Sequence, residues 1–149
     1  MHSQYLLNVR QKPEFMLAIM SALAGDAHIS FEGNLALCRF DKLPDSSHSE
    51  TDALRRNTAN PVLDFVVIPL EPDSVETIFK RIRMPGLLQR AIIHTQIEKS
   101  GTLEFGAYDN FHPECVVVGS RVSRELLDDL VDKRVLRSYS EAPPRAGGV

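Results

Sequence analysis

The sequence contains little cysteine and none of the short motifs that identify common enzymes. Its two cysteines, Cys38 and Cys115, show no spacing typical of a metal site, so we expect reduced thiols in a cytoplasmic protein. There is no glycine-rich phosphate loop, no serine nucleophile elbow and no Cys-x-x-Cys motif. These absences leave no signature of nucleotide binding, serine hydrolysis or dithiol redox chemistry, and no cofactor is predicted.

The chain also lacks a basic block and a long apolar run. Its formal net charge of −3 argues against a nucleic-acid partner. The longest apolar run, from Phe15 to Gly25, has about half of the roughly 20 residues that a membrane-spanning helix requires. Basic residues precede this run, as in a signal peptide, but Pro13 and Glu14 at its start favour a folded helix. We therefore expect neither a membrane segment nor secretion.

The composition is that of one globular domain. The chain has 149 residues, of which 43% are hydrophobic and 25% charged, enough to bury a core without disulfides or metals. We predict a single α+β domain over residues 1–139. Residues 140–149 are predicted to form a disordered tail, because they contain prolines and glycines and little apolar surface.

Hydrophobic periodicity divides this domain into strands and helices. Strands are expected at residues 5–9, 27–31, 35–40, 62–70, 93–98, 103–105 and 115–118. Helices are expected at residues 13–24, 74–83 and 123–136, each beginning at a proline or serine suited to a helix start. The polar insert of residues 41–60 is predicted to be irregular and mobile, with a short helix that begins near Ser49.

The stretch from His94 to Asp109 has the pattern of a β-hairpin with one apolar and one polar face. Apolar and polar side chains alternate along its first arm, as in a half-buried strand. A loop of three residues, Lys99 to Gly101, places Gln96 opposite Glu104 and keeps the two faces separate. It also places Gly101 where a type I turn with a bulge needs a left-handed residue.

Two parts of the chain repeat one order of elements. Residues 4–41 and 61–109 each read as strand, helix, strand, strand, and each contains His-x-x-x-Glu before a glycine turn (His28 to Glu32 and His94 to Glu98). Alternation directs the His and Glu side chains away from the helices. The predicted fold is a mostly antiparallel twisted sheet with helices on one face, built from two βαββ-like halves plus a C-terminal strand and helix.

The polar face of this sheet is the first candidate ligand-binding site. Its members are His28, Glu32, His94, Gln96, Glu98 and Glu104. The doubled βαββ order resembles that of vicinal-oxygen-chelate modules, which bind a metal in a cupped sheet, although their extra strands and ligand spacing are absent here. On this hypothesis His28, His94, Glu98 and Glu104 would hold a metal or act as acid–base groups. We favour a polar face that meets water or a partner, because residues four apart on a strand lie about 13 Å apart; no metal site is assigned.

The segment from Tyr108 to Cys115 is the second candidate. Tyr108, Asp109 and His112 are potential ligand-binding residues at a strand exit, where loops often carry function. A Cys115 nucleophile with His112 as its base is the catalytic alternative. Residues three apart on an extended chain face opposite sides, and Cys115 leads directly into an apolar strand. A buried structural thiol is therefore the preferred interpretation.

Two functions remain open on the sequence. The first is a non-enzymatic binding module that holds a small molecule or a protein partner on the polar face or the insert. The alternative is a small metal-assisted enzyme that uses the His and Glu side chains of that face. Because an open, one-sided sheet often pairs with a second copy, a homodimer is also expected.

Overall fold

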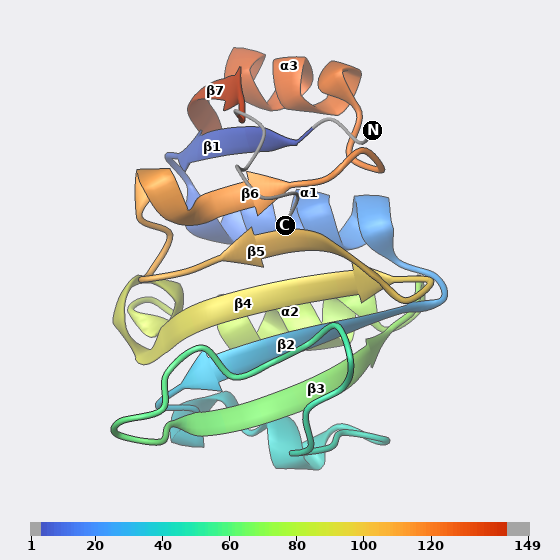
Figure 1. The fold of residues 1–149 in the computed structure, drawn as a ribbon, viewed down its shortest axis with the longest axis vertical. Coiled ribbons are helices and arrows are strands. Elements are labelled where there is room, and N and C mark those ends of the chain that lie inside the picture. The colour runs from blue at the N-terminus through green and yellow to red at the C-terminus, as the bar shows by residue number, and fades with distance from the viewer. Residues whose placement is uncertain (1–3, 143–149) are drawn as a thin grey trace.

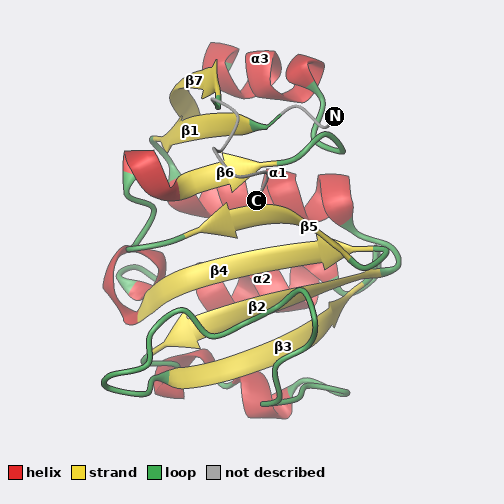
Figure 2. Ribbon diagram, in the orientation of Figure 1, coloured by secondary structure: helices red, strands yellow, loops and turns green. Residues whose placement is uncertain are grey.

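The computed structural model describes residues 4–142, which form a seven-stranded antiparallel sheet with helices behind it (Figures 1 and 2). The strands lie in the order β3-β2-β4-β5-β6-β1-β7. Their bounds are β1 (Tyr5–Val9), β2 (Ala27–Gly33), β3 (Asp64–Leu70), β4 (Ile92–Lys99), β5 (Thr102–Ala107), β6 (Val116–Val118) and β7 (Leu136–Glu141). The helices are α1 (Lys12–Leu23), α2 (Val75–Ile82) and α3 (Arg124–Asp132), with short helical turns at Leu87–Ala91 and Pro113–Cys115. The predicted α+β class and antiparallel sheet are confirmed.

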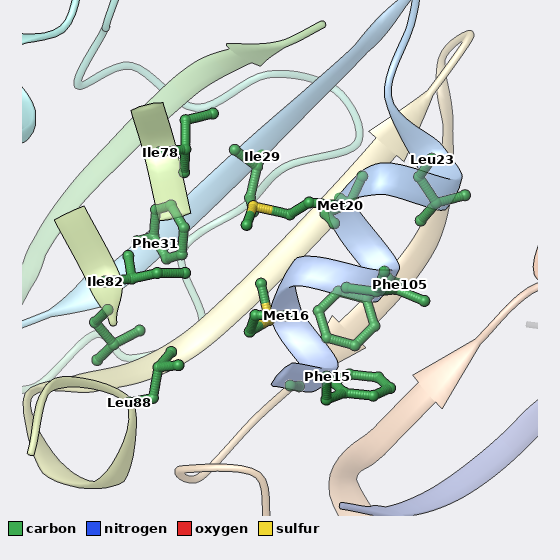
Figure 3. Packing of buried hydrophobic residues seen from close by; sticks show 14 of the residues in the cluster. Phe15, Met16, Met20, Leu23, Ile29, Phe31, Ile78, Ile82, Leu88 and Phe105 are labelled. Carbon is green, nitrogen blue, oxygen red and sulfur yellow. The ribbon is translucent and has the colours of Figure 1, made fainter. Parts of the chain in front are cut away.

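The main hydrophobic core lies between the sheet and helices α1 and α2 (Figure 3). Helix α1 is apolar around most of its circumference, and Phe15 and Met20 are fully buried. The Phe15 ring lies 5.7 Å from that of Phe105 on β5, and Ile29 and Phe31 of β2 enter the same cluster. The apolar side chains of the sheet thus face the helices, as the alternation pattern predicted.

Lys99 at the end of β4 fixes the C-terminal end of α1. Its ammonium group donates hydrogen bonds to the main-chain oxygens of Leu23 (3.1 Å), Ala24 (3.0 Å) and Gly25 (2.5 Å). The last carbonyl groups of a helix have no partners within the helix and carry partial negative charge. A cation from a distant strand therefore satisfies the helix end and ties α1 to the edge of the hairpin.

The strand predicted at residues 35–40 is wrong. The chain forms two short 3₁₀ turns instead, Ala36–Cys38 and Phe40–Lys42, separated by Arg39 in a left-handed conformation (φ 56°). Leu35 and Cys38 are buried while the two residues between them are exposed, which is the spacing of a helical turn rather than of a strand. Phe40 then stacks on Phe31 with ring centroids 4.8 Å apart.

The C-terminal helix is shorter than predicted and is followed by a strand that the sequence did not reveal. Helix α3 ends at Asp132, and Arg134 with φ 62° reverses the chain. Leu136, expected on the helix, begins β7, which pairs with β1. Ser140 and Glu141, expected in the tail, belong to this strand. The remainder of the predicted tail, residues 143–149, lies outside the described residues.

The β4–β5 hairpin has a two-residue turn, so the predicted three-residue loop is wrong. Lys99 pairs with Thr102, and both Ser100 and Gly101 have positive φ (52° and 85°), as a type I′ turn requires. Serine rarely takes this conformation, but Ser100 is fixed by hydrogen bonds to Asp26 in the neighbouring turn. A β-bulge beside Glu98 then restores the apolar register, with Ile97 opposite Phe105.

The two predicted halves are not equivalent in space. Residues 61–109 contain the expected elements β3, α2, β4 and β5, but the first half lacks its third strand. Strand β1 lies at the far end of the sheet from β2, whereas β3 lies two positions from β4. Only the adjacent strands β2 and β4 keep a local two-fold relation.

None of the helices in the described part of the chain is long and apolar enough to cross a membrane.

Replacing Gly101 by valine should lower the free energy of unfolding by about 1 kcal/mol or more, because a β-branched residue resists positive φ. A Cβ atom at this position meets no other atom within 4 Å, so the cost comes from the backbone conformation alone. Gly101→Asn is the matched control, since asparagine tolerates the left-handed region. Urea unfolding should show a clearly smaller loss for asparagine, and equal losses would contradict this account.

Candidate functional site

The polar candidates of the two His-x-x-x-Glu strands lie side by side in the centre of the sheet. Strands β2 and β4 pair antiparallel, so that His28 lies opposite Glu98 and Glu32 lies opposite His94. These side chains point away from the helices, as predicted. Yet Glu32 is only 1% exposed and His94 only 6%. Something other than the helices therefore covers this face.

The cover is the chain's own insert, which crosses the front of β2 and β3 (Figure 1). We call residues 47–58 the strap. At one end, Ser47 forms a β-bridge with Val67 on β3, and its main-chain N–H and C=O groups both bond to that residue. The short helix predicted near Ser49 is absent; instead, Thr51 and Leu54 close a tight turn through two hydrogen bonds. The prediction of an irregular insert is confirmed.

An apolar contact holds the middle of the strap. Leu54 is fully buried and forms a second, separate hydrophobic cluster with Phe65 and Val67 on the outer face of β3. The Arg56 guanidinium lies over the Phe65 ring, 5.0 Å from its centroid. Burying a leucine side chain contributes about 1.5–3 kcal/mol, so the strap has a substantial anchor of its own.

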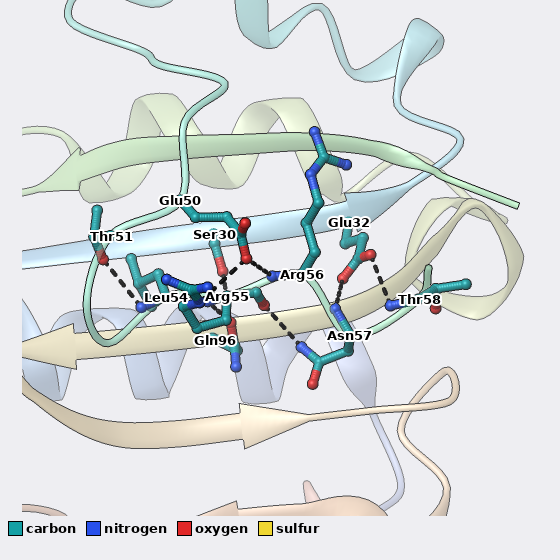
Figure 4. Close-up of polar contacts among 10 residues, drawn as sticks. All are labelled: Ser30, Glu32, Glu50, Thr51, Leu54, Arg55, Arg56, Asn57, Thr58 and Gln96. Carbon is teal, nitrogen blue, oxygen red and sulfur yellow. Dashed lines mark hydrogen bonds and ion pairs between the residues drawn. The ribbon is translucent and has the colours of Figure 1, made fainter. Parts of the chain in front are cut away.

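Main-chain N–H groups of the strap bind the polar side chains beneath them (Figure 4). The Glu32 carboxylate accepts hydrogen bonds from the N–H groups of Asn57 (2.8 Å) and Thr58 (3.1 Å). The Gln96 amide oxygen accepts one from Arg55 (3.2 Å). Hydrogen bonds to an ionised acceptor are stronger than neutral ones. Glu32 is therefore the principal polar anchor of the strap.

His94 is held in one tautomer by its two neighbours. Its Nδ1 atom accepts a hydrogen bond from the Asp109 N–H group (3.3 Å). A main-chain N–H group can only donate, so Nδ1 of the neutral ring carries no proton and Nε2 carries it. Nε2 therefore donates to the Thr58 hydroxyl, 2.9 Å away. A histidine that activates a hydroxyl nucleophile must accept its proton, and in this arrangement His94 does the reverse.

The loop that orients His94 has an unusual backbone. Asp109, Asn110 and Phe111 all have positive φ (52°, 55° and 66°), a conformation that costs energy for residues other than glycine. Asn110 compensates for this cost through its main-chain bond to Ile93 and its side-chain bond to Ile92. The loop also places the Tyr108 hydroxyl 3.0 Å from the Gln96 amide nitrogen, which donates to it.

The four residues of the metal hypothesis do not meet at one point. His28 and Glu98 form a pair at one end of the strands, with Nδ1 and Oε1 2.6 Å apart, and the other Glu98 oxygen accepts the Gly101 N–H. His94 lies at the opposite end, beside Glu32. Glu104 bonds to Arg121 beyond β5. Within residues 4–142, no cluster of three or more His, Cys, Asp or Glu is arranged to hold a metal ion.

The segment around Cys115 is arranged as a turn. The His112 Nδ1 atom accepts the Glu114 N–H at the start of a 3₁₀ turn. Burial raises the pKa of the Cys115 thiol, and the nearby Asp109 and Glu114 carboxylates raise this pKa further. A raised pKa disfavours the thiolate that a nucleophile requires. His112 is exposed and is not part of the cluster around His94.

A pocket of about 450 Å³ lies between the insert and β3. Leu35, Ala36, Phe40, Asp41, His48, Arg56, Val62, Leu63, Asp64, Phe65 and Val66 line it. Sequence reasoning missed this pocket, because it exists only after the insert folds back over β3. The strap contacts could not be predicted either. They are made by main-chain N–H groups of residues 55–58, and such groups do not depend on the type of side chain.

Glu32→Gln should release part of the strap, because one of the two N–H groups would then face an amide NH₂ group rather than an oxygen. We expect a loss of about 1–3 kcal/mol in the free energy of unfolding and faster hydrogen exchange at Asn57 and Thr58. Glu50→Gln is the control, since Glu50 also accepts a strap N–H group (Arg56, 2.8 Å) but is 33% exposed. Unchanged exchange in Glu32→Gln would refute the anchor role.

Comparison with known proteins adds no functional assignment to this geometry. No protein-family model matches the chain, and no curated protein and no solved structure has significant similarity to it.

Proposed function

We propose that the protein is a non-enzymatic binding module that takes a small aromatic or aliphatic group into the pocket between the insert and β3. The observation that carries this proposal is the pocket itself, because its volume of about 450 Å³ lies in the range of small-molecule sites. The polar sheet face, the other candidate surface, is already covered by the strap.

Apolar exposure at the pocket supports the proposal. Val62 lines the pocket and is 69% exposed, and Leu37, 71% exposed, follows the lining residue Ala36. Large apolar side chains that gather beside a concave surface are typical of interaction sites. Two aromatic residues, Phe40 and Phe65, are among the lining residues.

Polar groups of the pocket supply hydrogen-bonding capacity. The His48 Nδ1 atom bonds to the Phe65 main-chain oxygen at 2.9 Å, and because a carbonyl only accepts, Nε2 of the neutral ring is an acceptor. Arg56 donates through Nη1 to the Leu63 main-chain oxygen, and this bond together with its contact with Phe65 fixes its position. The lining also contains two acidic residues, Asp41 and Asp64. A group with a flat apolar body and polar substituents matches this lining.

The contacts made by the residues that the sequence suggested as catalytic also favour binding over catalysis. His94 donates to Thr58 instead of accepting a proton from it. The raised pKa of Cys115 opposes its use as a nucleophile. The buried carboxylates Glu32 and Glu98 each accept main-chain N–H groups. These side chains support the scaffold around the pocket.

Anilinonaphthalene sulfonate is a suitable probe, because it joins an apolar ring system to a polar group. We expect its fluorescence to rise on binding to the native protein. Ala36→Trp should fill the pocket and weaken binding by at least about tenfold, equivalent to roughly 1.4 kcal/mol. Glu125→Trp on the exposed side of α3 is the control and should bind like the native protein.

Val62→Asp provides a second variant, because this exposed position tolerates a charge without loss of fold. It should weaken binding in the same direction as Ala36→Trp. Urea unfolding of each variant verifies that the pocket is tested in a folded protein. No fluorescence change with the native protein, or equal affinity in all variants, would overturn the proposed pocket.

A further inference from the structure

Residues of both signs of charge line the pocket between the insert and β3. Arg56 of the strap and the two acidic residues Asp41 and Asp64 are among its lining residues. Within residues 4–142, none of these three side chains forms an ion pair. A charge that is withdrawn from water is normally paired. A cavity lined by both signs of charge, with neither paired, is therefore suited to a ligand that carries both.

The Arg56 side chain is held in place but keeps hydrogen-bonding capacity. Figure 4 shows it extending from the strap across β3, where its guanidinium lies 5.0 Å from the centroid of the Phe65 ring. Its Nη1 atom donates to the Leu63 main-chain oxygen. Its Nε and Nη2 atoms form no hydrogen bond within the described part of the chain. Because a guanidinium presents its donors in a planar fork that fits a carboxylate, Arg56 retains donors for such a group.

Asp64 lies next to this cation along the chain. Leu63, whose oxygen accepts the Arg56 bond, directly precedes it, and consecutive Cα atoms are about 3.8 Å apart. The Asp64 Oδ2 atom accepts the N–H of Leu35, which also lines the pocket. Its Oδ1 atom has no hydrogen-bond partner among residues 4–142. A cation and a carboxylate are thus tied to adjacent main-chain positions at the start of β3.

We propose that the pocket binds an α-amino acid with an apolar side chain, an inference that deepens the binding function proposed above and rests on it. The Arg56 guanidinium binds the carboxylate of the ligand, and Asp64 and Asp41 bind its ammonium group. One carbon atom separates the two charged groups of an α-amino acid, which suits partners held at adjacent main-chain positions. The ligand side chain contacts apolar lining residues such as Phe40 and Val62.

Ligands with a single charge or none fit this lining less well. An anion bound to Arg56 would share the pocket with two acidic residues, and a cation bound to those residues would share it with Arg56. Like charges brought together disfavour binding. An uncharged apolar ligand would leave both signs unpaired. A zwitterion satisfies both.

Three ligands of nearly equal size separate these cases. Phenylalanine carries both charges, hydrocinnamate only the negative one and phenethylamine only the positive one. Each is titrated into the full chain at neutral pH, and the amide NMR shifts of the lining residues Ala36 and Val62 report binding. Phenylalanine should bind at least about tenfold more tightly than either analogue, because each analogue lacks one set of hydrogen bonds to a charged group.

Variants that remove one sign of charge test each half of the assignment. The double variant Asp41→Asn/Asp64→Asn keeps an oxygen for the Leu35 N–H. It should weaken binding of phenylalanine and phenethylamine and strengthen that of hydrocinnamate. Arg56→Gln should weaken binding of phenylalanine and hydrocinnamate. Asp52→Asn, at an exposed strap position outside the lining, is the control and should bind all three ligands like the native chain.

The outcomes separate this inference from the proposed function. Urea unfolding first verifies that each variant is folded. Equal affinity of the native chain for the three ligands, or an order of affinities that neither charge variant changes, would overturn the assignment to an amino acid. Binding of anilinonaphthalene sulfonate without binding of phenylalanine would also overturn it, while the pocket would stand as a site for apolar groups. Absence of binding by both compounds would overturn the inference together with the proposed function.

Discussion

The antiparallel pairing of β2 with β4 determines where the other functional parts of the molecule lie. Its register brings Glu32 beside His94 and Ser30 beside Gln96, which creates a row of polar side chains in the middle of the sheet. The strap satisfies this row with main-chain N–H groups. Buried polar groups without partners lower the stability of a protein. The insert therefore stabilises the sheet by bonding to its polar side chains, and the sheet in turn holds the insert in place. The pocket beside β3 is a further product of that closure.

Much of the fold was predictable because it depends on local periodicity. The apolar pattern of α1 and the near-continuous apolar run of β3 each report a burial pattern that the structure retains. The alternation of β4 separates its apolar and polar side chains between the two faces, but the polar face is buried as well, so the predicted half-buried strand is wrong. The errors arose where a distant contact decides local conformation. Ser100 takes a left-handed turn because Asp26 binds it, and residues 136–141 become a strand because β1 offers an edge. Neither partner is visible in the local sequence.

The residues of the polar sheet face were predictable from the sequence, but their partners and the pocket beside β3 were not. His28, Glu32, His94, Gln96 and Glu98 all lie on the predicted polar face. Residue type alone suggested ligands for a metal or a partner. Their actual partners are mostly main-chain groups, such as the N–H groups of Asn57 and Gly101, and every residue except proline carries such a donor. A sequence therefore reveals the acceptors of such a network and conceals its donors.

The strap also has a consequence for the order of folding. Its anchors lie on β3, β2 and β4, so they are assembled only after those strands have paired. We therefore expect the strap to dock late, with its contacts absent from the transition state of folding. Substitutions at Leu54 or Asn57 would then accelerate unfolding and leave the folding rate nearly unchanged, which is the behaviour of positions with low φ-values. On this expectation, the contacts of the insert would slow unfolding of the sheet without affecting how fast the sheet forms.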